Sequence, residues 1–372
     1  MNILINASNL RAGGGLQVAD SVCRELHKYP QHEFTVVLPS LLEACAREIE
    51  AHPNVSVVEY NLPMNAEILL TGRDRIMDSL VKSREIRAVI SIFGPTRWKP
   101  NCLHLCGFAM SHIVLTDSPF WKRLSMPALI KAKIRNRLMS HDFKRCSNLF
   151  YTENEYISKR LRARLPGSEV VTITNNYNQI FDHPEAWEDK IAFPPFDGLT
   201  LLTVCNDYPH KNLSIIAPTL DELRRRYPDV KVRFALTVDD GKSFANLSDD
   251  ARKSVLFLGT VGIRQCPPLY RQSDIVLQPS LLECFSANYV EAMKMGLPII
   301  TTDLGFARSL CGDAAAYYSA TDPAALADAI AELYHSSEYR SQLVEKEKKQ
   351  SALFDTYEDR ARKLIETIER HA

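Results

Sequence analysis

The 372-residue sequence has no excess of charge of either sign and no long apolar run. Its 45 Lys and Arg residues balance its 45 Asp and Glu residues, so no overall field would attract nucleic acid, and no nucleic-acid partner is expected. No apolar stretch reaches the roughly eighteen residues that a membrane-spanning helix needs. The first residues, "MNILINASNL", contain no basic segment followed by a long apolar one. We therefore expect a cytoplasmic protein that at most lies peripherally on the inner membrane.

Cysteine spacing typical of metal sites is also missing. The nine cysteines are scattered, and none forms a C-x-x-C pair. Cys102 and Cys106 lie four positions apart, but no second pair of ligands stands near them at a zinc-like spacing. We expect reduced, mostly buried thiols and no metal site.

The G-x-G-x-x-G fingerprint of dinucleotide-binding proteins is absent as well. The stretch "NLRAGGGLQVA" (9–19) has three consecutive glycines instead, and "VVLPS" ends the next expected strand where an acidic residue would hold a ribose. A nicotinamide enzyme is therefore disfavoured. The glycine loop and the start of the following helix suit an anion, because backbone N–H groups can approach a ligand closely there. A tight turn without a ligand is the alternative.

The sequence does contain a regular alternation of strand-like and helix-like segments, which predicts parallel sheets with helical crossovers. Expected strands cover 2–6, 33–39, 55–60, 88–93, 102–109, 148–152, 169–174, 199–204, 231–238, 254–259, 274–279, 298–302 and 314–319. Expected helices cover 16–29, 41–51, 66–83, 154–165, 211–226, 267–273, the stretch after Ser286, 323–335, and a charged tail from 338 to 371 that breaks near Phe354. Residues 179–198, rich in proline and acidic residues, break the alternation and are predicted to link two domains.

Two loops of the second half carry candidate ligand-binding residues, because ligands of such folds bind at the carboxyl ends of the strands. In "VCNDYPHKNLSII" (204–216), His210 and Lys211 stand at an expected helix start. A lysine there opposes the helix dipole unless an anion lies between, which favours phosphate binding over a solvated lysine.

The second loop is "PSLLECFSANYVEAMKMGLPIITTD" (279–303), with Glu283 and Glu291 eight residues apart. Asn288 and Glu291 can be interpreted as a helix capping box, which leaves Glu283 unexplained. Carboxylates can instead accept hydrogen bonds from sugar hydroxyls, while free N–H groups in "FSAN" (285–288) suit a diphosphate.

Five motifs in register resemble those of retaining glycosyltransferases of family 4 (glycosyl transferases group 1), of the bacterial surface-polysaccharide type. They are the E-x7-E element of Glu283 and Glu291 with "AMKMGLPIITTD", "PHKNL", the "GGG" loop, "VTITNNYNQIF" (171–181) and "RQSDIVLQPSLLE" (271–283). The resemblance is tight over about 200–320 and loose before it. It implies the GT-B fold, in which two doubly wound Rossmann-like α/β domains face each other across a cleft. The implied domains are an acceptor-binding domain (1–180), a donor-binding domain (181–352) and a C-terminal helix (353–372) that packs back on the first.

The resemblance also implies roles for individual residues. Glu283 would contact the transferred sugar, Glu291 the ribose, and Lys211 the diphosphate, together with backbone amides. Neutralising the leaving group in this way requires no cofactor and no divalent metal, and neither glutamate would act as a glycosidase acid or base. The implied donor-binding residues are Gly14, Gly15, Asn206, His210, Lys211, Arg264, Glu283, Phe285, Ser286, Ala287, Asn288 and Glu291.

Two positions depart from the family pattern. Where the family has an arginine about six residues before its lysine, this sequence has Cys205 or Asn206, so Arg264, His210 or a backbone amide would have to replace it. For the family's mid-domain histidine there are two candidates. Strand alternation buries His104, so His112 is predicted as the catalytic residue that accompanies Glu283 and Lys211.

A basic segment, "FWKRLSMPALIKAKIRNRLMSHDFKR" (120–145), interrupts the first half. It is either a solvated helix with an apolar core stripe or a patch that binds an anionic membrane surface, with Phe120 and Trp121 entering the headgroup region. The predicted patch consists of Trp121, Lys122, Arg123, Lys131, Lys133, Arg135 and Arg137.

The predicted function is transfer of a sugar from a nucleotide-sugar donor to a saccharide or polyprenyl-linked acceptor. Synthesis of O-antigen, capsule or lipopolysaccharide is the expected setting. The alternatives are a nucleotide-sugar epimerase or phosphorylase of the same fold, and a non-catalytic donor-binding scaffold subunit.

Overall fold

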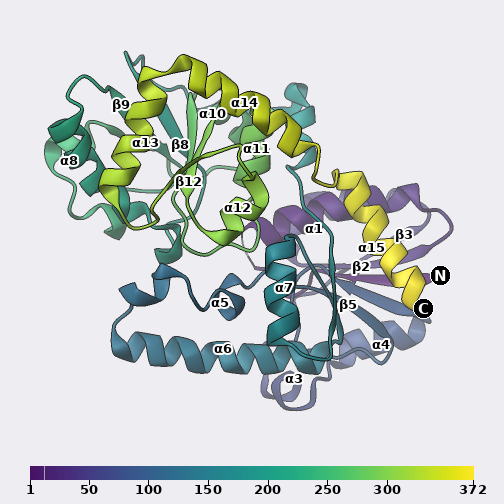
Figure 1. The fold of residues 1–372 in the computed structure, drawn as a ribbon. Coiled ribbons are helices and arrows are strands. Elements are labelled where there is room, and N and C mark those ends of the chain that lie inside the picture. Colours follow the sequence, from purple (N-terminus) through teal and green to yellow (C-terminus); the bar gives the residue numbers. More distant parts are fainter. Residues whose placement is uncertain (12) are drawn as a thin grey trace. The chain divides into compact units, whose positions relative to one another are not determined.

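The computed structural model describes residues 1–11 and 13–372, which form two compact units, each built on a parallel sheet covered by helices (Figure 1). The first unit contains residues 1–116, 125–178 and 355–372, and the second contains 117–124 and 179–354. The chain thus passes between the units at 178–179 and 354–355, where the sequence predicted boundaries at 180–181 and 352–353. Residues 117–124 correct that prediction, since they belong to the second unit although they were expected within the first domain.

The first unit has a seven-stranded sheet in the order β3-β2-β1-β4-β5-β6-β7, with every neighbouring pair parallel. The centre of this sheet is covered on both faces, so its strands are continuous apolar runs such as Ile3, Leu4 and Ile5, which have no exposed surface. The strands are β1 (Asn2–Asn6), β2 (Glu33–Leu38), β3 (Val55–Glu59), β4 (Ala88–Ser91), β5 (Leu103–Gly107), β6 (Leu149–Thr152) and β7 (Glu169–Thr172).

The helices of the first unit lie near the predicted positions, except that the short helix Ser111–Val114 was not predicted and one predicted helix is divided. The helix expected over 66–83 breaks at Gly72, whose left-handed φ of 72° ends α3, and Asp74 then caps α4 by accepting a hydrogen bond from the Met77 amide at 2.9 Å. The helices are α1 (Gly14–Glu25), α2 (Glu43–Ile49), α3 (Ala66–Thr71), α4 (Arg75–Ser83), α5 (Ser111–Val114), α6 (Met126–Cys146), α7 (Glu155–Arg164) and α15 (Tyr357–His371).

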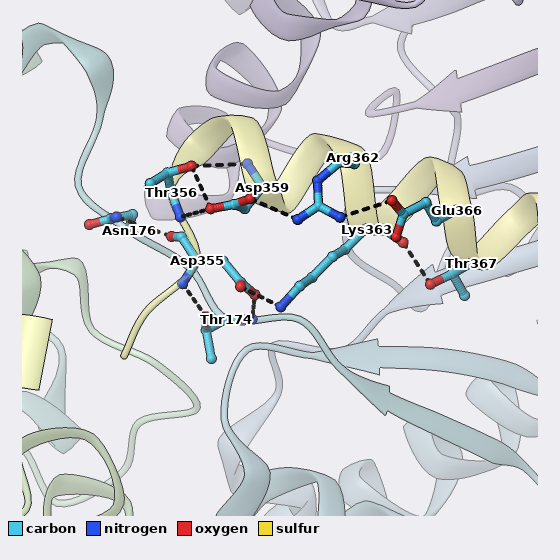
Figure 2. A network of polar contacts seen from close by, with 9 residues as sticks. All are labelled: Thr174, Asn176, Asp355, Thr356, Asp359, Arg362, Lys363, Glu366 and Thr367. Carbon is cyan, nitrogen blue, oxygen red and sulfur yellow. Dashed lines mark hydrogen bonds and ion pairs between the residues drawn. The ribbon is translucent and has the colours of Figure 1, made fainter. Parts of the chain in front are cut away.

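The C-terminal helix α15 packs on the first unit, as the sequence predicted. Its Leu364, Ile365 and Ile368 lie in the same apolar cluster as Ile3 of β1 and residues of α1. Asp355, just before α15, is held by the chain that follows β7 (Figure 2). Its carboxylate accepts a hydrogen bond from the Thr174 amide at 2.9 Å and pairs with Lys363, and its carbonyl accepts one from Asn176 at 3.0 Å.

The second unit has a six-stranded parallel sheet in the order β10-β9-β8-β11-β12-β13. From β8 the chain order runs outward through β9 to β10, and from β11 it runs outward on the other side through β12 to β13. The adjacent strands β8 and β11 therefore form the topological switch point of the sheet. The strands are β8 (Leu199–Thr203), β9 (Val232–Leu236), β10 (Val255–Phe257), β11 (Ile275–Gln278), β12 (Ile299–Thr302) and β13 (Ala316–Tyr318). The helices are α8 (Ile216–Arg226), α9 (Asp249–Arg252), α10 (Cys266–Arg271), α11 (Ala287–Met295), α12 (Gly305–Cys311), α13 (Pro323–His335) and α14 (Ser337–Ser351).

Residues 179–198 are part of the second unit rather than a free linker. The Phe193 amide donates to Gln272 at 2.8 Å, Asp182 pairs with Lys294, and the Trp187 indole donates to the Ile180 carbonyl at 2.7 Å. The prolines and acidic residues that suggested a linker therefore belong to a segment without regular structure that packs on this unit. Among residues 1–11 and 13–372, no helix is both long and apolar enough to cross a membrane.

Candidate functional site

The two loops singled out in the second half of the sequence meet at the switch point of the second sheet. Strands β8 and β11 are parallel neighbours, with Leu201 opposite Ile275, so the loops after them begin at the same edge. The Leu281 amide donates a hydrogen bond to the His210 carbonyl at 2.8 Å. Segments about seventy residues apart in sequence are therefore joined directly at the place where this type of sheet binds ligands.

Lys211 and Glu283 form a nearly buried ion pair between these loops. The Lys211 Nζ lies 2.6 Å from Glu283 Oε1, and the side chains are only 17% and 10% exposed. Burial by itself lowers the pKa of Lys211, but the Glu283 carboxylate outweighs that effect and leaves the pKa raised. The lysine is therefore a fixed cation at this edge of the sheet.

The structure corrects the prediction that Lys211 stands at the start of a long helix. The residue does not begin a long helix, because it lies in the 3-10 turn Pro209–Lys211, and α8 starts only at Ile216. Asn212 ends that turn in the left-handed conformation, with φ of 58°, which asparagine tolerates better than most residues. The group that neutralises the lysine here is the Glu283 carboxylate rather than a helix-bound anion.

Gln278, the last residue of β11, connects most of the polar side chains of the second loop. It is 1% exposed, and its Nε2 lies 3.2 Å from Glu283 Oε1 and 3.1 Å from the hydroxyls of Ser280 and Ser286. Its Oε1 accepts a hydrogen bond from Asn288 Nδ2 at 3.0 Å. Sequence reasoning missed this residue. A glutamine at the end of the apolar run "DIVLQ" could have indicated a polar site, because a buried side-chain amide needs hydrogen-bond partners.

The start of α11 overturns the capping-box interpretation of Asn288 and Glu291. The N-cap is Ser286, so Asn288 already lies inside the helix, and its side chain donates to the Val204 carbonyl at 2.6 Å as well as to Gln278. No side chain of the described residues caps this helix. The first-turn N–H groups of a helix have no intrahelical partners, so those at Ser286–Asn288 can bind an anion. The neighbouring Phe285 ring packs against Phe354, with ring centroids 5.9 Å apart.

Glu291 lies one turn further along α11 and has a different environment from Glu283. It is 6% exposed, and one carboxyl oxygen accepts a hydrogen bond from the Tyr270 hydroxyl at 2.6 Å. Burial raises the pKa of Glu291 to about 7, and the bond from Tyr270 only partly opposes this rise. Tyr270, on α10, was not predicted as part of the site. Its role in the site is hard to predict from sequence, because buried aromatic side chains are common in protein cores.

The remaining predicted residues of the second unit lie around the same loops. His210 stacks on Tyr208, with ring centroids 5.7 Å apart, and burial lowers its pKa. Asn206, which stands where the family has its arginine, is exposed, and its carbonyl accepts a hydrogen bond from the Tyr208 amide at 2.8 Å. Burial raises the pKa of the neighbouring Cys205 thiol to about 12. Arg264 is exposed in the 3-10 turn Ile263–Gln265, which leads into α10.

The glycine loop belongs to the first unit. Gly14 and Gly15 are the first residues of α1. Gly13 before them has a φ of 71°, a backbone conformation that residues with a side chain rarely adopt. A Cβ on Gly14 would meet no atom of the described residues within 4 Å. The backbone at Gly14 is thus open to a ligand, whereas residue 12 of the same loop lies outside the described residues.

The two candidate histidines of the first unit differ clearly. His104 is buried in β5, bonded to the Ser91 hydroxyl and the Cys146 carbonyl at 2.8 Å each, and burial lowers its pKa to about 4. His112 lies on α5 beyond the strand end, is partly exposed, and its carbonyl accepts a hydrogen bond from Asn136 at 2.8 Å. Strand alternation thus predicted the position of His104 correctly, and the catalytic role of His112 stays a prediction.

The predicted basic patch is divided between the two units, so it is not one surface of one unit. Trp121, Lys122 and Arg123 lie in a 3-10 turn of the second unit, where the Ser118 hydroxyl donates to the Leu281 carbonyl at 2.7 Å. Arg123 donates to Asn212 and to Ser214, so it binds the loop that carries Lys211. The other four residues of the patch, Lys131, Lys133, Arg135 and Arg137, lie on α6 of the first unit.

Comparisons with solved structures define the class of fold. A glycosyltransferase from Rickettsia africae aligns over 99% of this chain and 97% of its own, with a TM-score of 0.70 and 15% identity. Anabaena Alr3699/HepE, solved with UDP and glucose, aligns over 99% of both chains, with a TM-score of 0.63 and 15% identity. The chain therefore has the GT-B fold of two Rossmann-like domains, as the sequence predicted, and at such low identity these likenesses show the fold alone.

The match to a family model lies within the second unit. Residues 198–336 match the family described as glycosyl transferases group 1, a range that includes both loops of the candidate site. A phosphatidyl-myo-inositol mannosyltransferase of Mycobacterium leprae is 25% identical over 191 residues, which are 50% of each chain. The gpi3 subunit of phosphatidylinositol N-acetylglucosaminyltransferase of Schizosaccharomyces pombe is 31% identical over 114 residues, 29% of this chain and 24% of that one. The chain thus spans about half the length, or less, of these curated relatives.

Proposed function

We propose that the protein is a glycosyltransferase that takes a sugar from a nucleotide diphosphate-sugar. The observation that carries this proposal is the Lys211–Glu283 pair, 2.6 Å apart, at the switch point of a sheet beside the uncapped start of α11. A cation, a carboxylate and free helix N–H groups at one edge match the diphosphate and hydroxyl groups of such a donor. The group 1 match over residues 198–336 and the HepE structures with UDP and with UDP-glucose support this class of donor.

In the proposed reaction the bond between the anomeric carbon and the diphosphate oxygen breaks, and its electron pair stays on the diphosphate. The acceptor hydroxyl forms the new bond to that carbon on the same face and gives its proton to the departing phosphate oxygen, so the configuration is retained. Lys211 and the amides of Ser286, Ala287 and Asn288 stabilise the negative charge that develops on the leaving group. These groups would take the place of a divalent cation, so turnover requires no metal.

The two glutamates hold the donor at its two ends in this proposal. Glu283 exchanges its contact with Lys211 for hydroxyls of the sugar, while Gln278 keeps its carboxylate in place. Glu291 accepts a hydrogen bond from the ribose beside Tyr270. We further propose backbone contacts to the donor from Gly14 and Gly15 and a catalytic role for His112. Arg264 or His210 supplies the diphosphate contact that the missing arginine would make.

The proposed acceptor is a saccharide or a saccharide carried on a polyprenyl lipid, in bacterial O-antigen, capsule or lipopolysaccharide synthesis at an anionic, cytoplasmic membrane face. Fold likeness does not distinguish transferase from epimerase, because a putative UDP-N-acetylglucosamine 2-epimerase from Listeria monocytogenes also aligns over the whole chain, with a TM-score of 0.59 and 12% identity. The site therefore has to be tested by its chemistry.

The test is donor binding and turnover by the purified chain. A thermal-shift screen with UDP-, GDP-, dTDP- and ADP-sugars identifies the donor, and release of sugar from the radiolabelled donor, with and without EDTA, measures turnover. Lys211→Met and Glu283→Gln are expected to lose turnover by at least about a hundredfold. Lys363→Met is the matched control, because it breaks the Lys363–Asp355 ion pair on α15.

Distinct outcomes contradict distinct parts of the proposal. If none of the donors raises the melting temperature or is turned over, or if Lys211→Met keeps the turnover of Lys363→Met, the transferase assignment is wrong. Loss of turnover in EDTA contradicts the metal-free mechanism alone. Conversion of the donor to an epimeric nucleotide-sugar identifies an epimerase instead.

A further inference from the structure

The outer face of α6 is apolar, although α6 packs on the first unit through its other face. Met126, Ile130, Ile134 and Leu138 recur at every fourth position and are between 53% and 67% exposed. The residues that α6 buries are mostly small or polar: Ala132, Asn136, Ser140, Phe143 and Cys146. The helix is thus the reverse of an ordinary surface helix, in which the large apolar side chains face the core. This corrects the interpretation of the segment as a solvated helix with an apolar core stripe.

Cations border this apolar stripe on both sides. At about 100° per residue, Lys133 and Arg137 lie along one side of it and Lys131 and Arg135 along the other. All four are exposed. The carboxylate of α6, Asp142, is only 15% exposed and pairs with Arg97 at 2.7 Å, so it does not offset the exposed cations.

Helix α3 extends the apolar surface beyond the last turns of α6. The Arg145 guanidinium donates to the carbonyls of Ile68, Leu69 and Leu70, which holds the end of α3 beside α6, and Figure 1 shows the two helices adjacent. Leu70 is 81% exposed, and Leu69 and Met64 are exposed as well. We name the surface formed by the outer side of α6, by Leu69 and Leu70 of α3 and by Met64, which precedes α3, the α6 face. A cluster of exposed large apolar side chains on neighbouring segments is unusual on a monomer and indicates a binding surface.

We propose that the α6 face docks on a lipid bilayer that contains anionic lipid. Cations on both sides of an exposed apolar stripe are the arrangement of helices that lie in the plane of a membrane interface, where apolar side chains enter the acyl boundary and lysines and arginines reach anionic headgroups. The stripe from Met126 to Leu138 is about 18 Å long at about 1.5 Å per residue, which suits a helix lying along a surface. The purpose of docking, access to a lipid-linked acceptor, rests on the proposed function, but docking itself does not.

The inference differs from the sequence-based patch in its residues. Trp121, Lys122 and Arg123 are excluded because they lie on the second unit, where Arg123 is bound to Asn212 and Ser214. The apolar part is supplied by residues of α6 and α3 instead of Phe120 and Trp121.

The experiment is flotation of the full chain with vesicles of phosphatidylcholine, with and without phosphatidylglycerol. The wild type is expected to float with the anionic vesicles at low salt and to lose at least tenfold in binding at about 1 M salt, where the screening length falls to about 3 Å. Ile134→Ser/Leu138→Ser and Lys133→Glu/Arg137→Glu are each expected to lose about tenfold or more at low salt.

Matched controls separate this surface from general effects of substitution. Leu41→Ser removes a leucine of the first unit that is 61% exposed, and Lys82→Glu/Arg87→Glu reverses two exposed charges outside the α6 face. Both controls are expected to float like the wild type. The docking proposal is overturned if the controls lose as much binding as the α6 variants, or if the wild type binds neutral vesicles equally well.

Two further readouts keep the outcome unambiguous. The thermal shift with the nucleotide-sugar donor is measured for every variant. A chain that binds donor but never floats overturns docking and leaves the proposed function intact. A chain that floats but binds no donor overturns the proposed function and leaves docking intact. Sedimentation velocity of the wild type shows whether the α6 face instead joins two copies of the chain. A dimer that Ile134→Ser/Leu138→Ser converts to monomer would overturn the membrane assignment.

Discussion

Two regions of this protein carry many charges, and they use them in opposite ways. Around Glu283 in the second unit, charged and polar groups are nearly buried and each has a partner, as with Lys211 at 2.6 Å and Gln278 at 3.2 Å. On the α6 face of the first unit, four cations are exposed beside apolar side chains, and the nearby carboxylate of Asp142 is already paired with Arg97.

The difference between these regions is one of dielectric environment. A buried charge interacts strongly with its immediate neighbours, so losing one partner is costly and geometry is specific. Exposed charges are screened by water and salt, contribute little to stability one by one, and act together on an extended charged surface. The first arrangement suits the recognition of one small anionic ligand, and the second suits an anionic surface.

The largest expected effect is that of breaking the buried pair. Lys211→Met leaves Glu283 as a nearly buried charge without its cation, and we expect a loss of about 3–5 kcal/mol in the free energy of unfolding, measured with urea. Part of that loss should return in Lys211→Met/Glu283→Gln. The control is Lys231→Met, which breaks the exposed pair of Lys231 with Asp197 and should cost at most about 1 kcal/mol. If Lys211→Met and Lys231→Met lose equal free energy of unfolding, the buried pair is no stronger than the exposed one and the comparison of the two regions is wrong.

The pH dependence of stability tests the buried glutamate of the same region. Glu291 has a pKa of about 7 in the folded protein against 4.5 ordinarily, so between these values the folded state holds a proton that the unfolded state has lost. Its contribution to stability is complete below about pH 4.5 and lost as the pH rises through about 7, by up to about 3 kcal/mol at about 1.4 kcal/mol per pKa unit.

Glu291→Gln should remove this dependence. The measured quantity is the difference in unfolding free energy between wild type and variant across that pH interval, which cancels the contributions of other buried carboxyls such as Glu153. A difference that stays constant with pH would mean that Glu291 is ionised in the folded protein. Lysine and arginine substitutions on the α6 face should show no pH dependence in this interval, because those groups stay charged.

A smaller effect is expected for Gln278. Gln278→Leu keeps the volume but leaves Glu283, Ser286 and Asn288 without a shared partner, and we expect a loss of about 1–3 kcal/mol in the free energy of unfolding. Since Gln278 positions Glu283, the variant should also raise the KM for the donor more than it lowers kcat. Ile134→Ser on the α6 face is the comparison, with an expected change within about 0.5 kcal/mol. A purely structural Gln278 would change stability without changing KM.

The parts of the fold that sequence reasoning predicted are those determined by local patterns. Continuous apolar runs such as "NILIN" and "IVLQ" indicate buried parallel strands, and they lie at the predicted positions in both sheets. The glycine of "KMGLP" ends α11 in the left-handed conformation at Gly296, with φ of 69°, which is a local preference too. Glu283 and Lys211 could be selected from sequence because their loops follow strand ends, although the helix start expected at Lys211 was wrong.

What could not be predicted depends on contacts between distant segments. Spacing of four residues identifies an apolar stripe on α6 but not which side of the helix faces the core, and here Ala132, Asn136 and Ser140 are the buried side. In the same way, nothing local shows that 117–124 joins the second unit through the bond from Ser118 to Leu281, 163 positions away.

By itself, the sequence determined the two parallel sheets and the strand ends at which Lys211 and Glu283 stand, because apolar periodicity and backbone preferences act over a few residues. Only the tertiary structure decided that these two side chains neutralise each other, that Gln278 and Tyr270 hold the two glutamates, and that the apolar residues of α6 face outward. The physical reason is that burial and hydrogen-bond satisfaction are settled among groups far apart in the chain, and each side chain takes the partner that packing brings to it.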